Sequence, residues 1–225
     1  MLIHTAGENA LIVYFGDTPG PEVAARVNAL ASALPDALGD HLVDLIPSYA
    51  SLLVVYDALT SDHMHVRRCI HALPIDRVSV DDAGGRCVEL PVYYSEESGA
   101  DLAAVAERAR ISVSDVIELH SASEYRVYAI GFAPGFAYLG DVDERLKTPR
   151  LNTPRQRVPR GAVAIADRQT AVYPAVSPGG WNLIGSCPRR MFDPQHEPSM
   201  PVAVGDRVRF RPISRDEFLR AGGSL

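Results

Sequence analysis

The chain has 225 residues, 47% of them hydrophobic, and its 22 basic and 28 acidic residues give a formal net charge of −6 at pH 7. This length suits one large domain or two small ones, and the acidic excess without a dense Lys/Arg block argues against nucleic acid as a partner. No apolar run reaches the roughly 18 residues of a membrane span, and the amino-terminal segment lacks a basic region and cleavage site, so we expect a cytoplasmic protein with no membrane partner.

The first part of the chain alternates between strand-like and helix-like patterns. The expected strands cover residues 10–15, 42–46, 51–56 and 77–80. Apolar residues recur at helical spacing after the first strand, where Pro35 ends the pattern, and again between Ser61, the expected N-cap, and Pro74. This β-α-β-β-α-β order predicts a small ferredoxin-like α/β domain.

A polar, glycine-rich stretch at 81–85 indicates a linker, so we expect domains at 1–82 and 86–225. The second domain opens with a strand at 87–93, followed by a helix capped by Asp101 and one that begins with a capping box of Ser112 and Asp115. Short strands separated by Pro and Gly turns then predict a β-barrel or sandwich. Those strands cover residues 125–130, 162–166, 171–173, 181–184 and 206–212.

A Pro-Arg pair recurs every five residues, at Pro149-Arg150, Pro154-Arg155 and Pro159-Arg160. Proline fixes φ and removes a donor, so this stretch is neither a helix interior nor a central strand. A stiff segment loses little entropy on binding, and its guanidinium groups suit carboxylate or phosphate. The alternative is that these arginines hydrogen-bond within the loop and hold the fold.

Ser177-Pro178-Gly179-Gly180-Trp181 is the second segment suited to binding. Adjacent glycines let backbone N–H groups approach an anion, and the only tryptophan of the chain would form the floor of a pocket. The alternative is a tight turn beside a core tryptophan.

His120, which follows Glu118 and precedes Tyr125, is the candidate for proton transfer, and a histidine that hydrogen-bonds to hold a helix end is the alternative. The three cysteines lie far apart and form no zinc or disulfide pattern. His63, His65 and His71 share no i, i+4 pair, so no metal site is expected.

Several motifs in order resemble one family. They are SYASLLVVYD at 48–57, LPVYY at 90–94, GFAPGFAYLG at 131–140, the Pro-Arg series, AIA at 164–166 and YPAVSPGGWNLIG at 173–185. The chain therefore resembles the family of the 5-oxoprolinase B subunit, also called the allophanate hydrolase subunit 1 or KipI-like family, which is the carboxyltransferase domain, subdomain C and D.

The resemblance implies an α+β protein with a small α/β amino-terminal domain and a cyclophilin-like β-barrel carboxy-terminal domain. It implies one component of an ATP-dependent 5-oxoprolinase, which opens 5-oxo-L-proline to L-glutamate together with a C-subunit partner, similar to allophanate hydrolase subunit 2, and with the A subunit. The alternatives are an amidohydrolase subunit of the allophanate hydrolase or urea carboxylase type, and a KipI-like module that inhibits a histidine kinase. Because the chain has neither GxxxxGK[ST] nor GxGxxG, we expect ATP to be shared with partner subunits, and the chain to be inactive alone.

The expected catalytic residue is His120, and the expected substrate- or anion-binding residues are Arg150, Arg155, Ser177, Gly179, Gly180, Trp181 and Tyr125. The chain departs from the family pattern at six positions near these motifs. They are Arg160 for a small residue, Ala162 for Ser, Asp167 and Ala171 for Gly, and Ser186-Cys187 for Arg-Thr. These departures leave the substrate open among 5-oxoproline, allophanate and related compounds.

Overall fold

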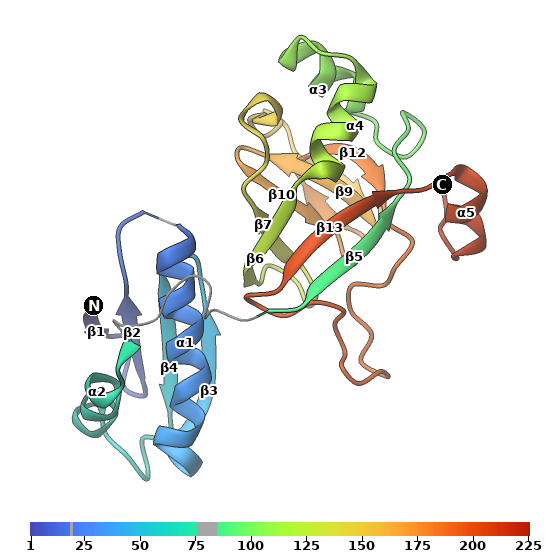
Figure 1. The fold of residues 1–225 in the computed structure, drawn as a ribbon. Coiled ribbons are helices and arrows are strands. Elements are labelled where there is room, and N and C mark those ends of the chain that lie inside the picture. Colours follow the sequence, from blue (N-terminus) through green and yellow to red (C-terminus); the bar gives the residue numbers. More distant parts are fainter. Residues whose placement is uncertain (19, 76–84) are drawn as a thin grey trace. The chain divides into compact units, whose positions relative to one another are not determined.

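The computed structural model describes residues 1–18, 20–75 and 85–225 and divides into two compact units, Met1–Gly85 and Arg86–Leu225 (Figure 1). The division falls at the predicted linker. The strand expected at 77–80 lies outside the described residues. None of the helices in the described ranges is long and apolar enough to cross a membrane.

The Met1–Gly85 unit is a four-stranded sheet with order β1-β2-β4-β3 and two helices. Its elements are β1 (Leu2–Thr5), β2 (Ala10–Tyr14), α1 (Pro21–Leu38), the 3-10 turn η1 (Gly39–His41), β3 (Leu42–Pro47), β4 (Ser51–Tyr56) and α2 (His63–Ala72). One face of the sheet and the apolar stripes of both helices enclose a single core, in which Leu11, Leu30 and Ile70 are fully buried. Helical periodicity in the sequence follows from this one-sided burial.

Part of the predicted topology is present in this unit. β4 pairs antiparallel with both β2 and β3, so β2 and β3 run parallel to each other with α1 between them in sequence. This is a split βαβ unit. The position beside β2 is occupied by β1, a strand that the sequence did not predict. The ferredoxin-like assignment is therefore not confirmed.

Two predicted helix boundaries are wrong. α1 continues through Pro35 to Leu38, where the N–H of Gly39 donates to the carbonyl of Pro35. Proline adopts a helical φ, and near a helix end it removes only one of the backbone hydrogen bonds. The N-cap of α2 is Asp62 rather than Ser61, and its carboxylate accepts the backbone N–H of His65 at 2.8 Å.

The Arg86–Leu225 unit is built on a seven-stranded sheet with order β12-β9-β10-β7-β6-β13-β5. Its strands are β5 (Cys87–Val92), β6 (Glu124–Ile130), β7 (Ala137–Gly140), β9 (Ala162–Ala166), β10 (Gln169–Val172), β12 (Asn182–Ser186) and β13 (Arg207–Pro212). The two edge strands meet where Tyr93 and Ser186 exchange backbone hydrogen bonds of 2.8 and 2.9 Å. This nearly closed sheet fits the expected cyclophilin-like barrel.

The helices of this unit are α3 (Leu102–Ala109), α4 (Val113–Ala122), the 3-10 turn η3 (Glu144–Leu146) and α5 (Arg215–Arg220). α3 and α4 lie beside the strands of this unit (Figure 1), and they contribute Leu102, Val105 and Val116 to the same core. The predicted capping box of α4 is confirmed, because Ser112 and Asp115 bond each other's backbone N–H groups.

Two short strands, β8 (Arg155–Val158) and β11 (Ser177–Gly179), form a separate antiparallel sheet. Neither was predicted. Pro154 and Pro178 flank or interrupt them, which two-stranded edges tolerate. This sheet brings the Pro-Arg segment and the Gly-Gly segment together, and it positions the site described next.

Candidate functional site

A pocket of about 120 Å³ lies beside the β8–β11 sheet, and we call it the aromatic pocket. Its walls are Phe132, Phe136, Tyr138, Arg150, Tyr173, Pro178, Gly179, Gly180 and Trp181. This volume is below the ~300 Å³ at which pockets for drug-sized ligands begin, so it suits a small molecule or one group of a larger one. The structure thus brings four of the predicted residues, Arg150, Gly179, Gly180 and Trp181, to one place.

Phe136 is the centre of the pocket's aromatic wall. Its ring makes edge-to-face contacts with Tyr138, Tyr173 and Trp181 at centroid distances of 4.9, 5.2 and 5.6 Å. Such pairs are favourable beyond the area that they bury, by about 0.5–1.5 kcal/mol each. Because Phe136 and Trp181 are also buried, the wall is a fixed surface.

Arg150 supplies the positive charge of the pocket. Its guanidinium carbon lies 5.8 Å from the centroid of the Trp181 ring, within the range of a cation–π contact. The side chain is exposed and has no carboxylate partner in the described part of the chain. The donors of its guanidinium are therefore free to bind an anion, while Trp181 holds the group in place.

Gly179 is required by close packing rather than by a left-handed turn. It lies in β11 opposite Arg155, and neither it nor Gly180 has a positive φ. A Cβ atom at Gly179 would overlap the hydroxyl of Tyr173 and would lie 2.9 Å from its Cζ atom. At Gly180 the nearest atom would be Cγ of Pro154 at 3.6 Å, an ordinary contact.

The hydroxyl of Tyr173 is a polar group of the pocket wall that lies close to Gly179. Burial raises its pKa, and the positive charge of Arg150 and a hydrogen bond from the Trp181 backbone oppose this in part. Tyr173 is therefore protonated at neutral pH, so it can donate a hydrogen bond.

Arg155 does not line the aromatic pocket. Its Nη2 donates to Oδ1 of Asp101 at 2.7 Å, and the backbone N–H of Leu183 donates to the other carboxylate oxygen at 2.7 Å. The arginine is 30% exposed and the aspartate 12%. This contact holds the fold, as in the structural alternative, but the partner is Asp101 outside the loop rather than a group within it. It also explains why Asp101 begins α3 without a side-chain cap bond.

Two polar atoms of the small sheet are buried without a hydrogen-bond partner among the described residues, Nη1 of Arg155 and Oγ of Ser177. Ser177 pairs with Val158 and does not line the pocket. The predicted binding roles of Arg155 and Ser177 stay predictions.

His120 and Tyr125 lie in the core of the barrel-like sheet, away from the aromatic pocket walls. Oγ1 of Thr170 donates to the carbonyl of Ala164 at 3.0 Å, so it accepts from Nε2 of His120 at 2.9 Å, and Nδ1 accepts the hydroxyl of Tyr94 at 2.7 Å. Burial lowers the pKa of His120 to about 3. This geometry matches the alternative of a histidine that holds a helix end, and proton transfer by His120 stays a prediction.

Tyr125 supports the same helix end. Its hydroxyl donates to the carbonyl of His120 at 2.8 Å, and burial raises its pKa well above the ordinary value. The ring is fully buried against Phe210. Its predicted contact with substrate stays untested.

Apart from Trp181, sequence reasoning missed the aromatic residues at the pocket, which are Phe132, Phe136, Tyr138 and Tyr173. Phe132, Phe136 and Tyr138 all belong to the motif GFAPGFAYLG, whose repeated aromatic spacing was the signal that could have found them. Phe132 is 65% exposed and adopts a φ of 69°, which is rare for a bulky residue and is found at functional sites.

The departures from the family pattern do not line this pocket. Asp167 adopts a φ of 51°, the region in which the family's glycine is unstrained. Ala162 and Ala171 are buried in strands, and burial raises the pKa of the Cys187 thiol to about 11, so it is not a reactive thiolate. Together with Arg160 and Ser186, these positions lie outside the pocket wall.

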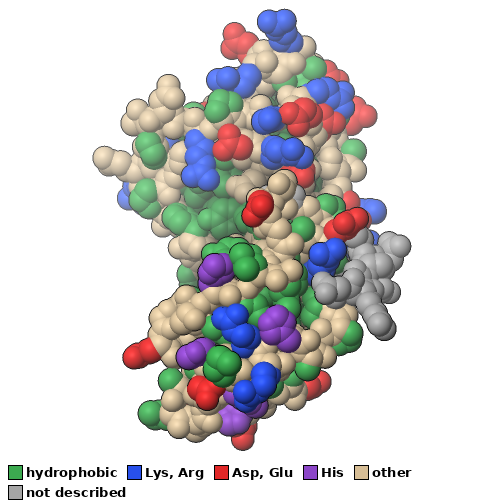
Figure 2. All heavy atoms as spheres, turned by 90° about the vertical axis from the view of Figure 1, so that its left-hand side faces the viewer, with side chains coloured by type: hydrophobic (Ala, Val, Ile, Leu, Met, Phe, Trp, Pro, Cys, Tyr) green, Lys and Arg blue, Asp and Glu red, His purple; other side chains and the backbone are tan. Residues whose placement is uncertain are grey.

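No group of three or more His, Cys, Asp or Glu that would hold a metal ion occurs within residues 1–18, 20–75 and 85–225. Several histidines lie at the surface of the Met1–Gly85 unit (Figure 2). Among them, His41 and His65 contact each other edge-to-face at 5.5 Å.

The fold and the pocket define a two-unit α/β protein whose second unit combines a barrel-like sheet with a small aromatic pocket. The chain matches the model of the family described as carboxyltransferase domain, subdomain C and D, over residues 1–202, and it belongs to this family. A curated relative, the B subunit of 5-oxoprolinase from Bacillus subtilis (strain 168), is 35% identical over 226 residues, which cover 96% of this chain and 94% of the relative.

Three solved structures are similar to this chain in fold. TTHA0988 is 40% identical with a TM-score of 0.82, and the match covers 91% of this chain but 40% of that chain, so this chain spans less than half of its length. The protein PH0987 from Pyrococcus horikoshii is 44% identical with a TM-score of 0.58, covering 96% of this chain and 100% of that one. The urea amidolyase of K. lactis, at 17% identity and a TM-score of 0.73, shares the fold.

Proposed function

We propose that this chain is the B subunit of an ATP-dependent 5-oxoprolinase that opens 5-oxo-L-proline to L-glutamate. The observation that carries the proposal is the match to a curated 5-oxoprolinase B subunit over nearly the full length of both chains. A subunit lettered B implies others beside it, so we propose that the chain works with a C-subunit partner and with the A subunit.

The aromatic pocket is the proposed place of the substrate. 5-Oxoproline is a five-membered lactam that carries one carboxylate. Its ring would pack against the aromatic wall, and the guanidinium of Arg150, which has no carboxylate partner in the described ranges, would bind the carboxylate. The hydroxyl of Tyr173 lies at the same wall and is a donor for the lactam oxygen.

ATP would phosphorylate the lactam oxygen and leave as ADP, one water would attack the activated carbon and break the ring C–N bond to give an acyl phosphate, and a second water would release phosphate and leave glutamate. The chain has no phosphate-binding loop of known pattern. We propose that partner subunits contribute to the nucleotide site, that the complex is cytoplasmic, and that the isolated chain turns over neither ATP nor lactam.

The test is coexpression with the neighbouring subunits, followed by assays of ATP hydrolysis and glutamate release with 5-oxoproline, other lactams, urea and allophanate. We expect 5-oxoproline to stimulate both activities in the complex and neither in the isolated chain. Stimulation by urea or allophanate alone would favour the amidohydrolase alternative. Failure to co-elute with the C-subunit partner, with inhibition of a histidine kinase instead, would replace the proposal by the KipI-like one.

A further inference from the structure

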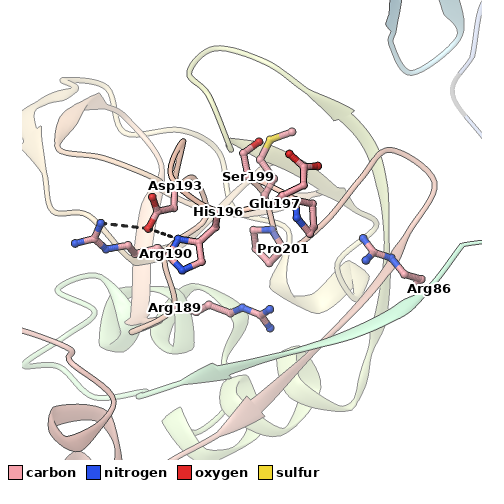
Figure 3. A pocket seen from close by; sticks show the side chains of 10 residues that line it. Arg86, Arg189, Arg190, Asp193, His196, Glu197, Ser199 and Pro201 are labelled. Atoms are coloured by element: carbon pink, nitrogen blue, oxygen red, sulfur yellow. Dashed lines mark ion pairs between the residues drawn. The ribbon is translucent and has the colours of Figure 1, made fainter.

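A second cavity, of about 700 Å³, opens on the Arg86–Leu225 unit, and we call it the arginine hollow (Figure 3). Its walls are Arg86, Arg189, Arg190, Asp193, His196, Glu197, Pro198, Ser199, Met200 and Pro201. The hollow and the aromatic pocket share no lining residue. The volume is that of a site for a cofactor-sized molecule, which spans ~300–1,000 Å³.

Arg86 is held in position by Asp206. The side chain of Asp206 is 6% exposed and accepts three hydrogen bonds of 2.9 Å each, from the backbone and Nη2 of Arg86 and from the backbone of Ala203. A guanidinium has five N–H donors, and this contact uses one of them. The remaining donors of Arg86 are oriented by a fixed partner and are available at the wall of the hollow.

Arg189 approaches from the opposite wall, and Figure 3 shows its guanidinium and that of Arg86 directed into the same space. Arg189 is exposed and forms no ion pair with any residue of the described ranges. An unpaired guanidinium beside a second, preoriented one offers N–H donors from two sides that an anion can bridge.

Of the two carboxylates in the wall, Asp193 is paired and Glu197 has no ion pair within the described residues. Asp193 lies 3.5 Å from Arg190 and 3.1 Å from His196, as the dashed lines in Figure 3 mark. A hydrogen bond from the Gln195 backbone, helped by Arg190 and His196, lowers the pKa of Asp193. Asp193 therefore compensates the charge of Arg190 and Asp206 that of Arg86, so Arg189 is the cation of the wall that has no ion pair within the described residues, and Arg86 contributes its remaining N–H donors.

The rest of the wall is a closed loop with an apolar side. The backbone N–H of Asp193 donates to the carbonyl of Ser199 at 2.8 Å, which ties the ends of this loop together. Pro198, Met200 and Pro201 add uncharged surface next to the arginines. A hollow with two guanidinium groups beside an apolar wall matches a ligand that has a charged phosphate chain and an uncharged body.

We propose that the arginine hollow binds the phosphate chain of a nucleotide-sized ligand, with Arg86 and Arg189 as the phosphate-binding residues. Guanidinium forks match phosphate oxygens in geometry and charge. That the ligand is ATP rests on the proposed function, whereas the site for a phosphate chain rests on the cavity and its arginines alone.

Calorimetric titration of the purified chain with inorganic tripolyphosphate and with ATP tests this. We expect both to bind, with affinity that falls as salt is added. Arg189→Glu should weaken both by at least about ten-fold, and Arg189→Ala by less. The matched control is Arg168→Ala, whose arginine pairs with Asp141 outside the hollow. Absence of binding at millimolar tripolyphosphate, or equal binding by Arg189→Glu and the wild type, would overturn the proposal.

The two ligands separate the possible sources of the phosphate chain. Tighter binding of ATP than of tripolyphosphate places the nucleoside on the apolar wall, and equal binding restricts the site to the phosphates. In the assembled complex, Arg189→Glu should raise the KM for ATP. If the complex hydrolyses ATP in response to the lactam and Arg189→Glu leaves this activity unchanged, the proposed phosphate-binding role of the arginine hollow is wrong and the proposed function stands. If the chain binds tripolyphosphate but its complex shows no lactam-dependent ATP hydrolysis, the phosphate site stands and the proposed function fails.

Discussion

Arg155 and Asp101 connect β8 to the start of α3 through a 2.7 Å ion pair, and the same carboxylate holds the backbone of Leu183 in β12. The pair thus joins three segments that are distant in sequence. Arg155→Ala would leave a largely buried carboxylate with one partner fewer. We expect a loss of about 1–3 kcal/mol in the free energy of unfolding, measured by chemical denaturation.

A role in binding makes a different prediction for the same variant. If Arg155 binds substrate, Arg155→Ala lowers kcat/KM of the complex while the melting temperature stays the same. Measuring both quantities separates the two roles. In a double-mutant cycle with Asp101→Asn, a coupling energy near zero would contradict the structural role.

Replacing Arg150 is expected to affect activity rather than stability, in contrast to the structural role of Arg155. Because it is exposed and unpaired in the described ranges, Arg150→Ala should leave the melting temperature unchanged and lower kcat/KM for 5-oxoproline by about 10- to 100-fold. Arg150→Lys should recover part of this, because an ammonium lacks the planar fork. Arg168→Ala, at a paired arginine outside the pocket wall, is the control. An unchanged KM in Arg150→Ala would exclude the carboxylate contact.

Alanine substitutions at the adjacent Gly179 and Gly180 should differ sharply in their effect on stability. Gly179→Ala forces the new methyl group into Tyr173, so we expect about 1–3 kcal/mol of destabilisation and loss of pocket binding. Gly180→Ala meets only an ordinary contact at 3.6 Å and should change stability by less than about 0.5 kcal/mol. Thermal melts of the two variants make the comparison, and similar melting temperatures would show that Tyr173 moves aside freely.

His120 predicts a pH dependence of stability. Burial lowers its pKa to about 3 from 6.5, so between these values the unfolded chain binds a proton that the folded chain does not. Stability therefore falls as the pH drops through this window, by up to about 1.4 kcal/mol per pH unit from this group. His120→Gln should flatten the curve of unfolding free energy against pH. Parallel curves for variant and wild type would mean that His120 is protonated in the folded protein.

What the sequence could predict was local. Ser112 and Asp115 of the capping box are three positions apart, and the spacing of apolar side chains marks α1 and α2 directly. The pairing of β8 with β11 depends on residues more than 15 positions apart with no alternating pattern, so neither strand gave a signal.

The site shows the same limit. Trp181 and Arg150 could be proposed because their residue types suit a pocket, and they do meet there. His120 was likewise proposed from its residue type, as a group for proton transfer. Its surroundings, however, come from Tyr94, Thr170 and Phe210, far away in the sequence. Burial of a titratable group is a tertiary property, and it decides which histidine stays neutral.

β13 is the last strand in the chain, yet it lies between β6 and β5 and pairs with both. Until residues 207–212 have left the ribosome, β5 lacks its neighbour in the sheet and keeps only the bridge between Tyr93 and Ser186 at its end. Unpaired strand edges on a nascent chain favour aggregation. The order of strands therefore couples completion of the sheet to the synthesis of residues 207–212, and a ribosome that stalls before residue 207 would release a protein with an open sheet.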